Sequence, residues 1–270
     1  MPFFEASDGT HLFYMDWGSG KPAVFSHAWG LNADMWDYQV PDLVDAGYRC
    51  ITFDRRGHGR SDRATTGYDY DTFADDLAAL IAQLDLEEAA LVGYSAGCSE
   101  ITRYLDRHGR DQVDRVVFGG PLMPLIVKRD DNPEGVDPAY VEASAAALKR
   151  DVPGWCAENA APFFGTAEPV SPGMVDWVTR QIVATPLKVL LDTLRLGAET
   201  DHREQLAKIE VPTMVVHGTH DASAPIDLTG RKTAALVPEC ELVVYQNAAH
   251  GLYAAQAARF NADLIAFLKS

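Results

Sequence analysis

The feature that most constrains the fold is a continuously apolar run, residues 89–94, that leads directly into a glycine-flanked serine. The motif is Gly93-Tyr94-Ser95-Ala96-Gly97, and a helical pattern containing Ile101 and Leu105 follows it. A short run without polar alternation is typical of a strand covered on both faces, as in a parallel sheet. We therefore predict a buried strand, a tight turn and a helix, a local geometry that lifts a serine hydroxyl out of the sheet edge.

Further short strand patterns occur on both sides of this run, and helical patterns separate many of them. The expected strands cover residues 12–17, 23–27, 48–53, 113–119, 211–217 and 240–245, and a helix is expected at 254–268. Strands joined through helices form right-handed crossovers in a parallel sheet. The sequence therefore predicts an α/β fold with a mostly parallel central sheet flanked by helices.

The alternation stops between residue 121 and about residue 210. Prolines and aromatic residues are frequent there, and the patterns at 139–148, 174–183 and 186–196 indicate helices without strands between them. A chain of 270 residues is near the upper limit for one hydrophobic core. We predict a single domain over residues 1–270 with a helical cap inserted at about 121–210.

The charge and the cysteines restrict the partners. The formal net charge is −16, which disfavours binding to nucleic acids and to anionic membranes. No apolar stretch is long enough to span a bilayer, and the N-terminus has no pattern of a secretory leader. The four cysteines are scattered without a CxxC pair, which favours a reducing, cytoplasmic location and argues against a zinc site; they are Cys50, Cys98, Cys156 and Cys240.

A serine hydroxyl is a weak nucleophile and needs a general base that a third group orients. Asp221 and His250 each follow an expected strand, so both are predicted at the carboxyl edge of the sheet, beside Ser95. The order Ser95, Asp221, His250 is the nucleophile–acid–base order of α/β-hydrolases. His220 is an alternative base, but its position next to the acid makes it difficult for it to bridge to the serine. His58 and His217 are expected to make structural hydrogen bonds.

Catalysis at Ser95 also requires donors for a developing oxyanion. The backbone N–H of Ala96, directly after the serine, is the expected first donor. The backbone N–H of Trp29, in the loop after the strand at 23–27, is the expected second donor, with its indole facing the acyl pocket. Packing is the alternative role for the indole. Residues beside the catalytic loops or in the cap are expected to line the pocket or, alternatively, to pack in the core: Leu122, Met123, Phe163, Phe164, Ile226 and Leu252. Cys98 is expected to pack inward.

Several motifs resemble the α/β-hydrolase superfamily, and more narrowly its cofactor-free haloperoxidase/perhydrolase branch, which includes bacterial arylesterases and γ-lactamases. The N-terminal motifs are residues 17–20 (Trp-Gly-Ser-Gly), 27–29 (His-Ala-Trp), 54–61 (Asp-Arg-Arg-Gly-His-Gly-Arg-Ser) and 91–95. The likeness continues at residues 162–165, 170–177 and 250–252, so it covers nearly the whole chain.

The resemblance implies the triad Ser95, Asp221 and His250, with oxyanion donors at Trp29 and Ala96. It also implies hydrolysis of small esters, a side activity in which hydrogen peroxide forms a peracid, no metal or haem cofactor, and homo-oligomers. The chain departs from the branch in having Ala28 where the family usually has glycine. Ala96 is smaller than the usual methionine or threonine, and residues 119–124 (Gly-Gly-Pro-Leu-Met-Pro) replace a Pro-Pro-Leu-Met type of stretch.

The sequence therefore predicts a metal-free serine hydrolase of small carboxylic esters, lactones or γ-lactams that works through an acyl-enzyme on Ser95. A carbon–carbon bond hydrolase or a hydroxynitrile lyase with the same triad is the alternative. A non-catalytic binding module is a third hypothesis, but it predicts a broken triad. Dehalogenases and epoxide hydrolases are disfavoured because their nucleophile is an aspartate, whereas this chain has Ser95.

Overall fold

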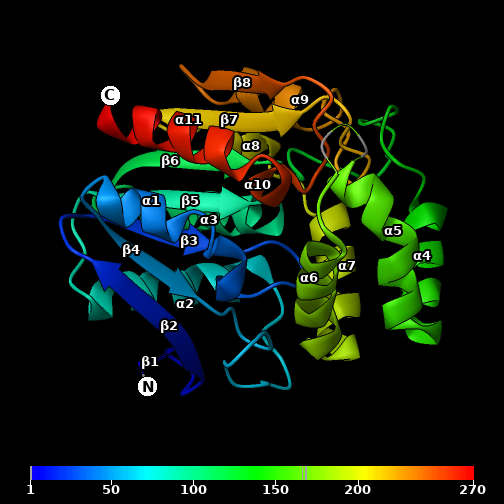
Figure 1. The fold of residues 1–270 in the computed structure, drawn as a ribbon, viewed down its shortest axis with the longest axis horizontal. Coiled ribbons are helices and arrows are strands. Elements are labelled where there is room, and N and C mark those ends of the chain that lie inside the picture. Colours follow the sequence, from blue (N-terminus) through cyan, green and yellow to red (C-terminus); the bar gives the residue numbers. More distant parts are fainter. Residues whose placement is uncertain (1, 166, 168) are drawn as a thin grey trace.

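The computed structural model describes residues 2–165, 167 and 169–270. These residues form an eight-stranded sheet in the order β1-β2-β4-β3-β5-β6-β7-β8. Strands β3 to β8 are parallel, whereas β2 pairs antiparallel with both β1 and β4 (Figure 1). The strands are β1 Phe3–Glu5, β2 His11–Gly18, β3 Lys21–Ser26, β4 Tyr48–Phe53, β5 Ala89–Tyr94, β6 Val113–Gly119, β7 Thr213–Gly218 and β8 Glu241–Tyr245. The prediction of a mostly parallel sheet is confirmed.

Helices cover both faces of the sheet. Helices α2 and α3 pack on one face, and α1 and α11 pack on the other (Figure 1). The helices are the 3₁₀-helix Ala33–Trp36, α1 Val40–Asp45, α2 Tyr70–Gln83, α3 Ala96–His108, α4 Pro138–Arg150, α5 Val152–Phe164, α6 Pro172–Ala184, α7 Leu187–Glu199, α8 Arg203–Leu206, α9 Gly230–Leu236, α10 Leu252–Ala255 and α11 Ala257–Lys269.

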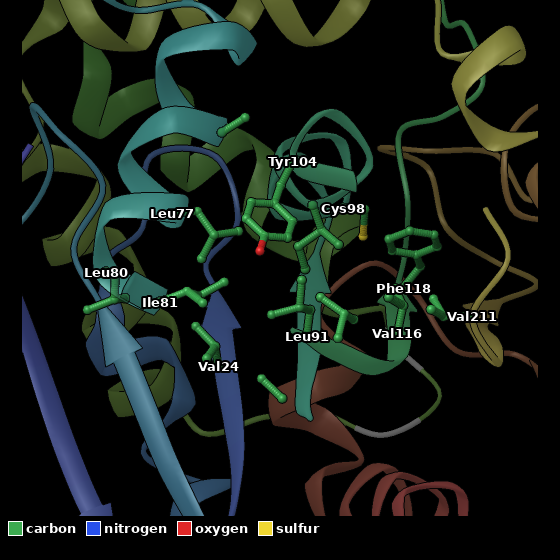
Figure 2. Close-up of a cluster of buried hydrophobic side chains, with 14 of the residues drawn as sticks. Val24, Leu77, Leu80, Ile81, Leu91, Cys98, Tyr104, Val116, Phe118 and Val211 are labelled. Carbon is green, nitrogen blue, oxygen red and sulfur yellow. The ribbon is translucent and has the colours of Figure 1, made fainter. Parts of the chain in front are cut away.

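The apolar run of β5 is explained by burial on both faces. Leu91 points to the side of α2 and α3, where it joins Leu77 and Cys98 in one core cluster (Figure 2). Val92, its neighbour in the strand, belongs to the cluster on the opposite face. Successive side chains of a strand point to opposite faces, so a strand buried on both sides needs apolar residues at every position. Cys98 packs inward, as predicted.

Helices α4 to α7 lie between β6 and β7 in the chain and stand beyond the carboxyl ends of the strands (Figure 1). The helices expected at 139–148, 174–183 and 186–196 correspond to α4, α6 and α7. Helix α5 was not predicted, because Pro153, Gly154 and Pro162 interrupt its apolar pattern. Pro153 is tolerated in the first turn, where its missing N–H would have no helical partner, and the Asp151 carboxylate caps that turn by accepting from the N–H of Gly154 at 2.9 Å.

Other differences from the sequence predictions are local. Strand β3 ends at Ser26, so His27 is already in the following loop, and the helix expected at 254–268 is divided at Gln256 into α10 and α11. Strand β1 was not predicted. None of the helices in the described residues is both long enough and apolar enough to cross a membrane.

Candidate active site

The loops that carry the expected site residues follow neighbouring parallel strands. Trp29 follows β3, Ser95 follows β5, Leu122 follows β6, Asp221 follows β7 and His250 follows β8. Because the carboxyl ends of parallel strands meet at one edge of a sheet, residues far apart in the sequence converge there.

The turn that carries Ser95 is strained and tightly packed. Ser95 has φ +54° and ψ −115°, between the end of β5 and the start of α3. A Cβ atom at Gly97 would lie 2.2 Å from the carbonyl oxygen of Ser26, and one at Gly93 would lie 2.8 Å from the backbone nitrogen of Cys98. Both positions therefore require glycine, and the turn presents the serine side chain at the sheet edge.

Ser95, His250 and Asp221 form a continuous hydrogen-bonded series. His250 Nε2 lies 3.0 Å from Ser95 Oγ, and His250 Nδ1 lies 2.6 Å from Asp221 Oδ2. All three residues are buried, with 3% to 5% of their surface exposed. An imidazole that donates through Nδ1–H to the carboxylate presents the Nε2 lone pair to the hydroxyl, as a general base requires.

The carboxylate of Asp221 is held in place from several directions. Its Oδ1 accepts the backbone N–H groups of Ser223 at 2.9 Å and Ala224 at 2.7 Å. His217 Nε2 lies 3.1 Å from Oδ2, on the same oxygen that contacts His250. Burial alone would raise the pKa of Asp221, but the charge of His250 and the hydrogen bonds from His217 and His250 outweigh it and hold this pKa below its ordinary value. The acid is therefore ionised at neutral pH.

The contact between His217 and Asp221 was missed at the sequence level. His217 does make the expected structural hydrogen bond, since its Nε2 lies 2.8 Å from the carbonyl oxygen of Ala224. The i, i+4 spacing of a strand-end histidine and the acid is the signal that could have indicated the second contact. His220, the alternative base, is exposed, and its ring contacts the hydroxyl of Thr219 at 3.2 Å.

The backbone N–H groups of Ala96 and Trp29 are the two expected oxyanion donors. Ala96 is the first residue of α3, and the first N–H groups of a helix have no intrahelical acceptor. Among the described residues, the N–H of Trp29 has no hydrogen-bond acceptor either. The indole Nε1 of Trp29 donates to the carbonyl oxygen of Leu190 at 3.1 Å, and its ring contacts that of Trp155 edge-on at 5.5 Å.

The loop that carries Trp29 is also bonded to helix α6 and its C-terminal cap. The hydroxyl of Thr185 donates to the carbonyl oxygen of Gly30 at 3.1 Å, and Gln181 Oε1 accepts the N–H of Asn32 at 3.4 Å. Gly30 packs closely on the helices, because a Cβ atom at this position would lie 3.1 Å from a methyl carbon of Leu190. The position of this loop therefore depends on α6 and α7.

A buried ion pair joins the start of the same loop to α3. Glu100 Oε2 accepts hydrogen bonds from Arg55 Nη2 at 2.7 Å, Arg55 Nε at 2.9 Å and Ser26 Oγ at 2.5 Å. Arg55 Nη2 also donates to the carbonyl oxygen of His27 at 2.9 Å. This pair therefore links the helix that begins at Ala96 to the loop that leads to Trp29.

A cavity of about 380 Å³ opens onto Ser95 and His250. Its walls are mainly apolar and come from the loop after β3, from the loop after β6 and from helices α4 to α7. Four of the expected pocket residues are among them: Trp29, Leu122, Phe163 and Phe164.

The other three expected pocket residues do not line this cavity. Met123 is fully buried in the core cluster under α2 and α3, where its sulfur lies 3.1 Å from the hydroxyl of Thr102. Leu252 is 1% exposed and belongs to the core cluster on the opposite face of the sheet, and Ile226 is buried outside the cavity wall. Neighbouring residues in a loop point in different directions, so Leu122 faces the cavity whereas Met123 faces the core.

Within the part of the chain that the structure describes, no cluster of three or more His, Cys, Asp or Glu side chains is arranged to hold a metal ion. The chemistry that the arrangement can perform is nucleophilic attack by a serine with general-base assistance and backbone stabilisation of an oxyanion.

Comparison with known proteins identifies the family. The family model of the α/β-hydrolase fold matches residues 21–254. The chain belongs to this family. It is 40% identical to a non-heme chloroperoxidase from Kitasatospora aureofaciens, over 99% of both chains. It is 34% identical to a bifunctional esterase/perhydrolase from Acinetobacter calcoaceticus, over the full length of both.

The solved structures give the same relationship. A bromoperoxidase from Bacillus anthracis superimposes with a TM-score of 0.95 at 36% identity, covering 100% of this chain and 99% of that chain. The resemblance to the haloperoxidase branch that the sequence motifs indicated is confirmed.

Proposed function

We propose that this α/β-hydrolase is a serine hydrolase of small carboxylic esters, and that lactones (cyclic esters) or γ-lactams (cyclic amides) are further substrates. The observation that carries the proposal is the unbroken series from Ser95 Oγ through His250 to Asp221, at the wall of a largely apolar cavity. The relative from Acinetobacter calcoaceticus described as an esterase/perhydrolase supports the ester class.

In the acylation step, Ser95 Oγ attacks the acyl carbon while His250 Nε2 takes the hydroxyl proton. The N–H groups of Trp29 and Ala96 bind the oxyanion of the tetrahedral intermediate. Its collapse expels the alcohol, which receives the proton from His250, and leaves an ester on Ser95. Asp221 stabilises the imidazolium that forms between these two transfers.

In the deacylation step, water attacks the acyl-enzyme, His250 takes a proton from it, and the acid leaves as Ser95 regains its proton. Hydrogen peroxide can take the place of water, and the product is then a peracid, which oxidises halides outside the enzyme. The relatives described as a chloroperoxidase and as an esterase/perhydrolase support this side activity.

The proposal includes a single domain, residues 1–270, with a cap at about residues 121–210 that controls access to Ser95. Residues of α5 and α6 support it, because Trp155, Phe163 and Val178 line the cavity together with Ser95 and His250.

The test is hydrolysis of 4-nitrophenyl acetate by Ser95→Ala, with Ser99→Ala as the matched control. Ser99 is a buried serine in α3, the helix that follows Ser95, and it has no part in the triad. Ser95→Ala is expected to lose activity on the order of 10⁴-fold, while Ser99→Ala keeps it. A folded Ser95→Ala variant with undiminished activity rejects the proposal. Labelling of Ser95 by a fluorophosphonate in a wild-type protein that cleaves no ester would instead indicate lyase or carbon–carbon hydrolase chemistry.

A further inference from the structure

A second cavity, of about 370 Å³, lies beside the one that contains Ser95. It is bounded by α4, α7 and the loops that follow β6 and β7, and Val141, Gly197 and Ala198 line it without reaching the first cavity. The residues shared by the two cavities form the boundary between them: Leu122, Tyr140, Ser144, Leu194, Ala222 and Ser223. The cavities are therefore adjacent, and a molecule bound at Ser95 that extends past this boundary enters the second one.

The second cavity lies on the side of the triad acid. Ala222 and Ser223 line it, and they directly follow Asp221, which accepts the N–H of Ser223. Trp29, whose N–H is the proposed oxyanion donor, lines the first cavity alone. The leaving alcohol receives its proton from His250 Nε2, so its oxygen must lie beside that atom and away from the oxyanion donors at Trp29 and Ala96.

The residues that line the two cavities indicate which kind of ligand group can bind there. Among the described residues, no Asp, Glu, Lys or Arg side chain lines either cavity. An ionised group there would lose its hydration without gaining a counterion. Tyr140, Ser144 and Ser223 carry hydroxyls and are among the residues shared by the two cavities, whereas Val141 and Ala198 are apolar residues that line only the second cavity. The occupant is thus an uncharged, apolar group.

We infer that the second cavity is a subsite for the alcohol portion of neutral esters whose alcohol carries an extended alkyl or aryl group. The inference rests on the proposed ester hydrolysis and narrows its substrate class. The first cavity then holds the acyl group, so acyl length and alcohol length are recognised by different walls.

Matched substitutions can fill the two cavities separately. Ala198→Leu in α7 places three additional carbons in the second cavity, and Ala160→Leu in α5 places the same group in the first cavity. Gly197→Leu is the second probe of the alcohol subsite. A Cβ atom at this position meets Leu122 Cδ1 at an ordinary 3.4 Å, and leucine is a better helix former than glycine.

The experiment compares kcat/KM for ethyl acetate, hexyl acetate and ethyl hexanoate in the wild type and the three variants. In Ala198→Leu and Gly197→Leu, the kcat/KM for hexyl acetate relative to that for ethyl acetate is expected to fall about tenfold, because each methylene that loses apolar contact lowers kcat/KM roughly fourfold. The kcat/KM for ethyl hexanoate relative to that for ethyl acetate is expected to fall only in Ala160→Leu. A circular dichroism spectrum like that of the wild type shows that each variant is folded.

The outcomes separate the subsite from the function on which it rests. Two results overturn the assignment of the alcohol subsite. In the first, the kcat/KM for hexyl acetate relative to ethyl acetate is unchanged in both Ala198→Leu and Gly197→Leu. In the second, these two variants lose kcat/KM for ethyl hexanoate alone. Failure of the wild type to hydrolyse all three esters overturns the proposed function instead.

Discussion

The buried ion pair between Glu100 and Arg55 offers a quantitative test of how the loop carrying Trp29 is held. The substitution Glu100→Gln keeps the shape of the side chain and removes its charge. Glu100 is 0% exposed and Arg55 is 3% exposed, and the guanidinium contacts the carboxylate through two nitrogens at 2.7 and 2.9 Å. Leaving a buried charge without its partner typically costs about 3–5 kcal/mol of folding free energy. The free energy of unfolding of Glu100→Gln is therefore expected to be lower than that of the wild type by this amount.

The matched control is Glu142→Gln. Glu142 contacts Arg195 at 2.8 Å, but its side chain is 60% exposed, so water replaces the lost interaction. The assay is urea unfolding of the wild type and both variants at one pH, with the free energy extrapolated to water. We expect a large shift of the midpoint for Glu100→Gln and almost none for Glu142→Gln. Similar small shifts in both variants would refute the argument that burial makes the first pair important.

Three further predictions test other parts of the structure. Thr185→Val removes the hydrogen bond to the loop that carries Trp29 and should lower kcat by about 2- to 10-fold with little change in KM. Thr193→Val should leave kcat unchanged, because the Thr193 hydroxyl bonds within its own helix, and steady-state kinetics measure both effects. Burial lowers the pKa of His202 from 6.5 to about 4, so the unfolded chain binds more protons between these pH values. The free energy of unfolding should therefore fall by about 1.4 kcal/mol per pH unit, from this group, as the pH drops from 6.5 to 4. Urea unfolding at several pH values should show a weaker pH dependence of this free energy in His202→Gln. Gly97→Ala should lose most ester hydrolysis, because the new Cβ would lie 2.2 Å from a backbone oxygen of β3, whereas Gly173→Ala, with 3.7 Å to its nearest neighbour, should retain it.

The central sheet could be predicted because its strands are buried on both faces. A strand such as β5 must be apolar at every position, and that leaves a signal that does not depend on distant contacts. The positions of Ser95, Asp221 and His250 followed from the same strands, since each residue comes just after one of them. Topology alone brings such loops to one edge of the sheet.

The parts that could not be predicted depend on side-chain direction and on tertiary contacts. Met123 and Leu252 stand beside residues of the site in the sequence, but their side chains point into the core. Glu100 is charged and lies in a helix, a pattern that usually indicates the surface, and its burial becomes understandable only with Arg55 in place. The same holds for His217, whose second partner is known only once Asp221 is positioned.

The most direct test of the central claim is to trap the acyl-enzyme. The wild type is mixed with 4-nitrophenyl trimethylacetate, whose hindered acyl group leaves slowly, then quenched in acid, digested and analysed by peptide mass spectrometry. We predict one trimethylacetyl group on Ser95, formed together with a burst of nitrophenol and absent in His250→Ala. Steady release of nitrophenol from a protein whose Ser95 peptide stays unmodified would contradict the account.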